Sequence, residues 1–137
     1  MDYIFAHKLE ARFRDCDPLG HVNNAVYLTY LEQARFAHWR SIWGFGTDHP
    51  APEVPGVILA RAEIDYRAPA RYGDALEIRI AIAAVGRTSF TYDYQIVNGR
   101  GEVIATARTV LVLYDYRTNQ PVPIPDSVRE MFAVRQG

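Results

Sequence analysis

The sequence lacks the features of exported and membrane-embedded proteins. Cys16 is its single cysteine, so no internal disulfide can form. No apolar run approaches the roughly 20 residues that a membrane-spanning helix needs. The first residues also lack the basic and then apolar layout of a signal peptide. We therefore expect a cytoplasmic protein without membrane association.

An excess of either charge is also missing. Fifteen Lys and Arg residues against 16 Asp and Glu residues leave a formal net charge of -1. No long-range basic field is thus available to attract nucleic acid. The four histidines and the cysteine have no metal-ligand spacing, and no glycine-rich phosphate loop occurs. We predict no nucleic-acid partner, no metal and no cofactor.

What the chain does contain is enough apolar material for one core. Hydrophobic residues make up 49% of its 137 residues, which is the size of one ordinary domain. No stretch is low in complexity, and no segment repeats at a fixed period. We predict one domain over residues 1–137.

The first half of the chain predicts a strand followed by a long helix. Apolar and charged residues alternate from Lys8 and predict a strand that runs to about Cys16. Residues 17–24 are rich in turn formers. From about Asn24 to Trp43 there is no Gly or Pro, and apolar residues recur at three- and four-residue steps. Their arc is wide, so we expect most of this helix to be covered.

The second half predicts four strands and a short terminal helix. Gly and Pro between residues 44 and 56 indicate an irregular, mobile loop. A period of two then predicts strands near residues 61–67, 76–82, 89–96 and 102–114. The last is apolar on both faces and should lie inside the sheet or under an interface. A helix is predicted from Asp126 or Ser127 through Phe132.

This order predicts an α+β fold, a five-stranded antiparallel sheet wrapped around one long central helix. The late strands have connections short enough for antiparallel pairing. A single-layer sheet leaves a face and its edges uncovered, and the chain has a surplus of apolar residues. We therefore expect a homo-oligomer, at least a dimer.

The most informative segment reads FRDCDPLGHVNNAVYLTYLEQAR over residues 13–35. Asp17, Gly20 and Tyr27 have the offsets of an Asp, two residues, a Gly, a short polar segment and a Tyr early in a helix. This pattern resembles the signature of the 4-hydroxybenzoyl-CoA thioesterase branch of the hotdog superfamily. Residues 64–76 resemble that family's next strand-turn-strand passage. The resemblance implies a hotdog fold, hydrolysis of acyl-CoA, and a homodimer or homotetramer.

The chemistry of thioester hydrolysis fits this segment. It needs a base or nucleophile beside the carbonyl and donors for the developing oxyanion, which a helix N-terminus supplies. In the resembled family the residue matching Asp17 attacks the thioester or activates water, and the backbone N–H matching Asn24 polarises the carbonyl. The choice between nucleophile and base stays open. The predicted substrate-binding residues are Gly20, His21, Asn23, Tyr27 and Arg87.

Four of these positions have a structural alternative. Asp17 precedes a proline and a glycine, so its side chain is also suited to cap its own turn. His21 either orients the substrate or is an ordinary loop histidine. The Asn23 side chain either donates to the substrate or caps the helix. Tyr27 either lines the acyl pocket or packs in the core.

Neighbouring positions carry alternatives as well. Asp15 either raises the pKa of the next aspartate or pairs with an arginine or caps the turn. Cys16 is interpreted as a small buried residue rather than a nucleophile. In the resembled family, basic residues in the turn that holds Arg87 meet the CoA phosphates, but exposed hairpin arginines are common. Glu32 either reaches a partner subunit or pairs with Arg35.

Two other functions share this fold. A hotdog hydratase or dehydratase would use a histidine with a carboxylate, for which His21 with Glu32 or Asp17 is the candidate pair. A non-catalytic acyl-CoA-binding domain is the other alternative. The sequence leaves open the acyl group, the choice between CoA and acyl-carrier-protein thioesters, and the choice between dimer and tetramer.

Overall fold

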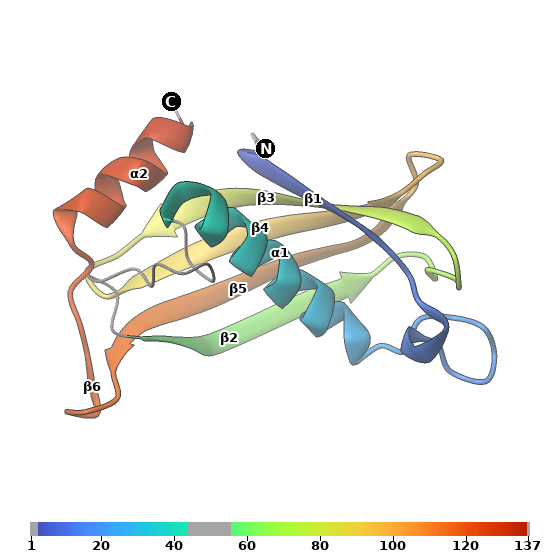
Figure 1. The fold of residues 1–137 in the computed structure, drawn as a ribbon, viewed down its shortest axis with the longest axis horizontal. Helices are drawn as coiled ribbons and strands as arrows, with labels where there is room; N and C mark the ends of the chain where they lie inside the picture. Colours follow the sequence, from blue (N-terminus) through green and yellow to red (C-terminus); the bar gives the residue numbers. More distant parts are fainter. Residues whose placement is uncertain (1–2, 44–55, 137) are drawn as a thin grey trace.

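The computed structural model describes residues 3–43 and 56–136, and Figure 1 shows one sheet curving around one long helix. Almost all of the predicted loop over residues 44–56 lies outside the described residues. In chain order the elements are β1 (Phe5–Glu10), a 3-10 turn η1 (Phe13–Asp15), α1 (Val26–Trp43), β2 (Val57–Tyr66), β3 (Ala75–Val85), β4 (Ser89–Asn98), β5 (Val103–Asp115), β6 (Gln120–Pro121) and α2 (Asp126–Gln136).

The sheet has the order β1-β3-β4-β5-β2, with every neighbouring pair antiparallel. The two-residue β6 adds to β5 and has no counterpart in the sequence prediction. The predicted α+β architecture of five antiparallel strands around one long helix is confirmed. The strand that is apolar on both faces, β5, lies between β4 and β2 as expected.

The helix α1 is held by one continuous buried face. Its buried residues recur at steps of three and four, which is the spacing of one helical face, and are Tyr27, Tyr30, Leu31, Ala34, Arg35, His38 and Trp39. Leu28 and Phe36, which widen the apolar arc in the sequence, are 40% and 39% exposed. The expectation that most of the helix circumference is covered is therefore wrong for the single chain, because the sheet covers only one face.

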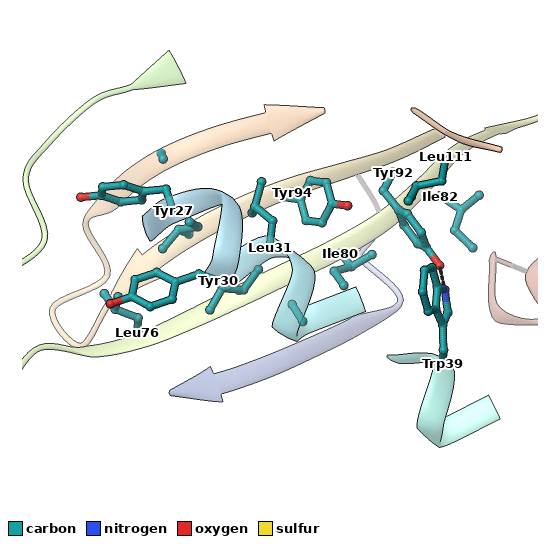
Figure 2. Close-up of a cluster of buried hydrophobic side chains, with 14 of the residues drawn as sticks. Tyr27, Tyr30, Leu31, Trp39, Leu76, Ile80, Ile82, Tyr92, Tyr94 and Leu111 are labelled. Atoms are coloured by element: carbon teal, nitrogen blue, oxygen red, sulfur yellow. Dashed lines mark hydrogen bonds between the residues drawn. The ribbon is translucent and has the colours of Figure 1, made fainter. Parts of the chain in front are cut away.

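The core beneath the second half of α1 combines aromatic packing with buried hydrogen bonds. The Trp39 indole N–H donates to the Tyr92 hydroxyl at 2.6 Å, and the His38 Nδ1 lies 3.2 Å from the same oxygen. Figure 2 shows Trp39 reaching from the helix to Tyr92 on β4. These contacts fix the helix against the centre of the sheet.

One turn earlier on α1, the buried Arg35 also bonds to a tyrosine hydroxyl of β4. Arg35 is 5% exposed and donates from Nη1 to the Tyr94 hydroxyl at 3.2 Å, and this hydroxyl also bonds to Thr109. Of the two alternatives for Glu32, the helix pair with Arg35 is wrong, because the guanidinium turns into the core while Glu32 stays exposed. Helical spacing alone does not reveal which face an arginine joins.

Two element boundaries before the helix differ from the prediction. β1 ends at Glu10 rather than near Cys16, because the Asp15 carboxylate accepts the Arg12 N–H and folds residues 13–15 into the turn η1. The helix begins at Val26 rather than Asn24. At the other end of the chain, α2 extends beyond the predicted end, to Gln136.

We expect Tyr92→Phe to lower the free energy of unfolding by about 1–3 kcal/mol, because the buried Trp39 N–H then loses its acceptor. Chemical denaturation followed by circular dichroism measures this. Tyr72→Phe is the matched control, since Tyr72 is 61% exposed and its hydroxyl makes no hydrogen bond within the described residues. Equal stability of the two variants would contradict the structural role of the Trp39–Tyr92 bond.

Candidate active site

The loop between η1 and α1 is a closed turn that presents Asp17. Cys16 and Val22 form an antiparallel bridge, and the Asp17 N–H donates to the His21 carbonyl at 2.9 Å. The Gly20 N–H donates to the Asp17 carbonyl at 3.0 Å. Gly20 has φ +85°, a left-handed conformation that glycine adopts without strain. The conformation explains why the motif has glycine there, whatever its relation to substrate.

The two oxygens of the Asp17 carboxylate have different surroundings. Oδ1 accepts the Leu19 N–H at 2.9 Å, so the turn-capping alternative is observed. Oδ2 has no hydrogen-bond partner within the described part of the chain. The side chain is half-buried. One oxygen therefore holds the turn while the other stays available, and the two interpretations of Asp17 are compatible.

A pocket of about 320 Å³ opens beside this turn. Its lining residues come from the turn, from the start of α1 and from the end of β2 with the connection after it; they are Asp17, His21, Val22, Asn24, Tyr27, Tyr66, Arg67, Ala68 and Pro69. Four predicted site residues thus come together: Asp17, His21, Asn24 and Tyr27. Gly20 and Asn23 flank the pocket without lining it.

The start of the helix leaves one backbone donor free. The Asn23 side chain accepts the Ala25 N–H at 2.9 Å, and the Asn23 carbonyl accepts the Val26 N–H at 2.9 Å. The capping alternative for Asn23 is therefore observed. Asn24 is exposed, and its N–H has no acceptor among residues 3–43 and 56–136. An uncapped N–H at a helix start is suited to bind a developing negative charge.

Tyr27 belongs to both the core and the pocket wall. It is 2% exposed, and its hydroxyl accepts the Ala70 N–H at 3.1 Å. Its ring meets Tyr66 edge to face, with centroids 5.1 Å apart. Burial raises the pKa of Tyr27, so its phenol stays neutral at ordinary pH. Tyr27 therefore packs in the core and also lines the pocket, so its two alternatives are compatible.

The end of β2 supplies a wall that the motif does not reveal. Tyr66 donates from its hydroxyl to the Asn24 carbonyl at 3.0 Å, although 42 residues separate the two. Arg67 lines the pocket beside it and donates to the Thr106 hydroxyl at 3.3 Å. The family resemblance of residues 64–76 was the available signal, yet it did not indicate which side chains face Asp17.

His21 keeps an available imidazole. Its backbone forms a bridge with Arg71, and its side chain lines the pocket without a hydrogen bond to the described part of the protein.

The Cys16 thiol lies 3.5 Å from the Arg12 carbonyl. Burial of the thiol, together with the nearby carboxylates, raises the pKa of Cys16. A thiol of raised pKa is a poor nucleophile. Cys16 is only partly buried, however, so its interpretation as a buried residue holds only in part.

Arg87 does not join the other predicted site residues in the single chain. It lies in the β3–β4 turn, where its carbonyl accepts the Ile124 N–H at 2.8 Å. Figure 1 shows this turn beside α2, at the opposite end of the sheet from the start of α1. The ten residues of β2 run between the two ends, a span of about 30 Å. Any contact between Arg87 and this pocket needs another subunit.

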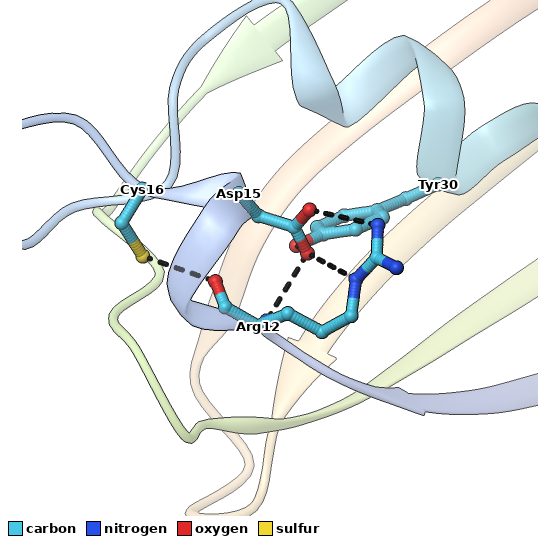
Figure 3. Close-up of polar contacts among 4 residues, drawn as sticks. All are labelled: Arg12, Asp15, Cys16 and Tyr30. Atoms are coloured by element: carbon cyan, nitrogen blue, oxygen red, sulfur yellow. Dashed lines mark hydrogen bonds and ion pairs between the residues drawn. The ribbon is translucent and has the colours of Figure 1, made fainter.

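Asp15 is a second carboxylate near the pocket, with the opposite environment. It is 4% exposed and accepts hydrogen bonds from the Tyr30 hydroxyl at 2.7 Å, the Arg12 N–H at 3.1 Å and the Arg12 guanidinium (Figure 3). Burial alone would raise its pKa, but the bonds from Arg12 and Tyr30 outweigh burial and hold the pKa below 3.8. Asp15 therefore pairs with an arginine and also caps the turn, as two of its predicted alternatives had it.

Features of other kinds of site are scarce in the described part of the chain. Among the described residues, no group of three or more His, Cys, Asp and Glu side chains is arranged to hold a metal ion. No described helix is long and apolar enough to cross a membrane. A second hollow of about 300 Å³ contains none of the predicted site residues and is lined by Tyr3, Glu63, Asp65, Asp93, Tyr94, Thr106, Ala107 and Arg108.

Comparisons with known proteins agree on one family. The model of the thioesterase-like superfamily matches residues 11–132. The 1,4-dihydroxy-2-naphthoyl-CoA hydrolase of Synechococcus elongatus is 30% identical over 97% of this chain and 96% of its own. The acyl-CoA thioester hydrolase YbgC of Escherichia coli is 27% identical over 91% of this chain and 92% of its own. A thioesterase from Thermus thermophilus, solved with coenzyme A and Zn, has a TM-score of 0.84 and 33% identity, covering 98% and 96% of the two chains.

We expect the stabilising effect of Asp15 to disappear in acid. Because its pKa is lowered on folding, its contribution is complete above pH 3.8 and is lost as the pH falls through the lower folded-state value. The Tm difference between wild type and Asp15→Asn should therefore be largest near neutral pH and shrink below pH 3.8. Asp65→Asn, which removes an exposed carboxylate, is the control. A Tm difference that stays constant with pH would contradict this assignment.

Proposed function

The chain belongs to the thioesterase-like superfamily and is a hotdog-fold acyl-CoA thioesterase, and from this premise we propose that Asp17 and the Asn24 N–H carry out the hydrolysis. The observation that carries this proposal is their position in one pocket. Asp17 offers a free carboxylate oxygen, and Asn24 offers a free backbone donor. These are the two groups that cleavage of a thioester requires.

The reaction has two balanced routes from this arrangement. In the first, Asp17 removes a proton from water, the hydroxide adds to the thioester carbon, and the Asn24 N–H stabilises the oxyanion. The carbon–sulfur bond then breaks, and the thiolate takes the proton to release CoA and the free acid. In the second, Asp17 attacks the carbon and expels the thiolate. Water then hydrolyses the resulting anhydride, which releases the free acid and restores the Asp17 carboxylate, and the proton set free is taken by the thiolate to give CoA. The oxyanion donor contributes roughly 100- to 1000-fold in rate in either route.

The remaining pocket residues are assigned to binding and orientation. His21, which lines the pocket, is proposed to hydrogen-bond the thioester or the pantetheine arm through its imidazole. Tyr27 and Tyr66 supply an aromatic wall for the acyl group, and Arg67 supplies a cation at the rim. The hydratase alternative loses one candidate carboxylate, because Glu32 does not line the pocket. This mechanism uses only protein groups and water.

A homodimer built through β2 completes the proposed site. β2 is a ten-residue edge strand, and no described strand pairs with its outer side. Long unpaired edges are the usual place for strand addition by a second chain. Because the end of β2 and the connection after it form one wall of the pocket, a second copy at this edge would border the active site directly.

Two-fold antiparallel pairing also gives Arg87 a role. It would bring the start of the partner's β2 beside the end of this chain's β2. Within one chain Val57 pairs with Leu113, whose N–H donates to the Thr88 carbonyl at 2.9 Å, so the Arg87 turn accompanies the start of β2. Arg87 of the partner subunit is thereby proposed to bind the CoA phosphates of a substrate held at Asp17.

Asp17→Asn should lower kcat by about 100-fold or more and leave KM nearly unchanged, because the amide keeps the turn but cannot act as base or nucleophile. Thiol release from an acyl-CoA panel measures the rate. Asp115→Asn is a matched control, since Asp115 caps its own turn by accepting the Arg117 N–H at 2.8 Å, away from the pocket. Undiminished hydrolysis by Asp17→Asn would refute the proposed role.

Mixing two inactive variants tests the shared site. If each site combines Asp17 of one chain with Arg87 of the other, Asp17→Asn and Arg87→Glu subunits form hybrid dimers with one intact site. After exchange of subunits, kcat/KM at low acyl-CoA should recover to about one quarter of wild type. Each variant mixed with itself is the control. Failure to recover activity when exchange is verified by native mass spectrometry would exclude the shared arrangement.

A further inference from the structure

We propose that Asp15 and Tyr30 act as positioning residues that hold Asp17 and the Asn24 N–H at a fixed separation. The proposal rests on the function assigned to those two groups and adds residues that do not line the pocket. Asp15 lies two residues before Asp17, and Tyr30 lies on α1. The geometry links the two sides of the active site through one buried carboxylate.

The side chain of Asp15 joins the turn η1 to the helix. Its Oδ2 accepts the Tyr30 hydroxyl at 2.7 Å, and its other bonds run to the backbone N–H and guanidinium of Arg12. Figure 3 shows the carboxylate enclosed between Arg12 and the Tyr30 ring. Because η1 leads directly into the Asp17 turn, a hydrogen bond to α1 at this point fixes how closely the turn approaches the helix.

The backbone of Asp15 makes a second connection to the same helix start. Its carbonyl accepts the Asn23 N–H at 2.9 Å. Asn23 precedes the proposed oxyanion donor, so this bond uses one N–H of the segment and leaves the next one, on Asn24, free. On the opposite side the Tyr66 hydroxyl holds the Asn24 carbonyl at 3.0 Å. The donor peptide is thus held between two hydrogen bonds from separate elements.

Tyr30 is suited to this role by its place on the helix. It follows Tyr27 by three residues, so both side chains leave the same face of α1, and their rings lie 6.2 Å apart. Tyr27 bonds to Ala70 beyond β2, whereas Tyr30 bonds to Asp15 beyond β1. The first turns of the helix are therefore tied to both walls of the site.

Asp15 has no position from which to act on substrate. Its side chain is buried, its hydrogen bonds are all to protein groups, and it does not line the pocket. Arg12 compensates its charge, which reduces repulsion toward Asp17. Asp15 can therefore affect catalysis only through the positions of Asp17 and the Asn24 N–H. Catalysis is sensitive to such positions, because a displacement of about 1 Å between reacting groups costs roughly 100-fold in rate.

Tyr30→Phe removes only the hydroxyl that reaches Asp15. We expect kcat for acyl-CoA hydrolysis to fall roughly 10- to 100-fold, with KM changed less than about twofold. Tyr92→Phe is the matched control, since it removes a buried tyrosine hydroxyl from the same helix–sheet interface but far from Asp17. It should lose comparable thermal stability and keep wild-type kcat. Equal kcat for Tyr30→Phe and wild type, or equal losses in both variants, would overturn the proposal.

Two further measurements separate positioning from general stability. Asp15→Asn keeps an oxygen that accepts the Tyr30 hydroxyl, so it should retain roughly tenfold more activity than Asp15→Ala. In the Asp17→Asn background, Tyr30→Phe should lower the residual rate by less than about twofold, because the group being positioned is gone. Additive losses in that double variant would contradict the proposal.

Failure of the positioning role is distinguishable from failure of the proposed function. If Asp17→Asn retains full activity, the assignment of Asp17 fails, and the positioning role fails with it. If Asp17→Asn is inactive while Tyr30→Phe and Asp15→Ala are both fully active, the assignment of Asp17 stands and only the positioning role is overturned. All rates are to be taken below the onset of unfolding of the least stable variant.

Discussion

Burial of one face of α1 against a single curved sheet is the constraint on which the rest of the structure depends. The helix residues that point to the sheet recur at three- and four-residue steps, and the strands beneath them present alternate side chains. Packing of this kind fixes the helix along its length, and just before the helix begins the Asn24 N–H has no acceptor among the described residues. The candidate active site lies at that end.

Two carboxylates near this helix start have opposite surroundings although one residue separates them in sequence. Asp15 is buried and satisfied by Arg12 and Tyr30, and its pKa is lowered. Asp17 is half-buried and uses one oxygen for its own turn. The turn η1 explains the difference, because it rotates successive side chains away from strand alternation. Asp15 thereby has a structural task, while the catalytic task is the one proposed for Asp17.

The single chain leaves exposed surface at the place where a shared site would need it. The outer side of β2 has no described partner, and Leu59 and Tyr66 on β2 are 45% and 49% exposed. Tyr66 at the end of β2 borders both this edge and the pocket. A second subunit at this edge would cover apolar surface and bring a separate set of residues to the substrate. Folding and completion of the site would then share one driving force, the burial of apolar area.

Sequence periodicity and one motif determined much about this protein by themselves. The periods of two and 3.6 residues predicted the strands, the long helix and the antiparallel sheet, because side-chain alternation is a local property of the backbone. The motif around Asp17 indicated the family and the relevant end of the helix. Only the tertiary structure decided the burial of Arg35, the approach of Tyr66 to Asn24, and the distance of Arg87 from the pocket. Each of these depends on hydrogen bonds or packing that only the folded chain brings together, which no local pattern encodes.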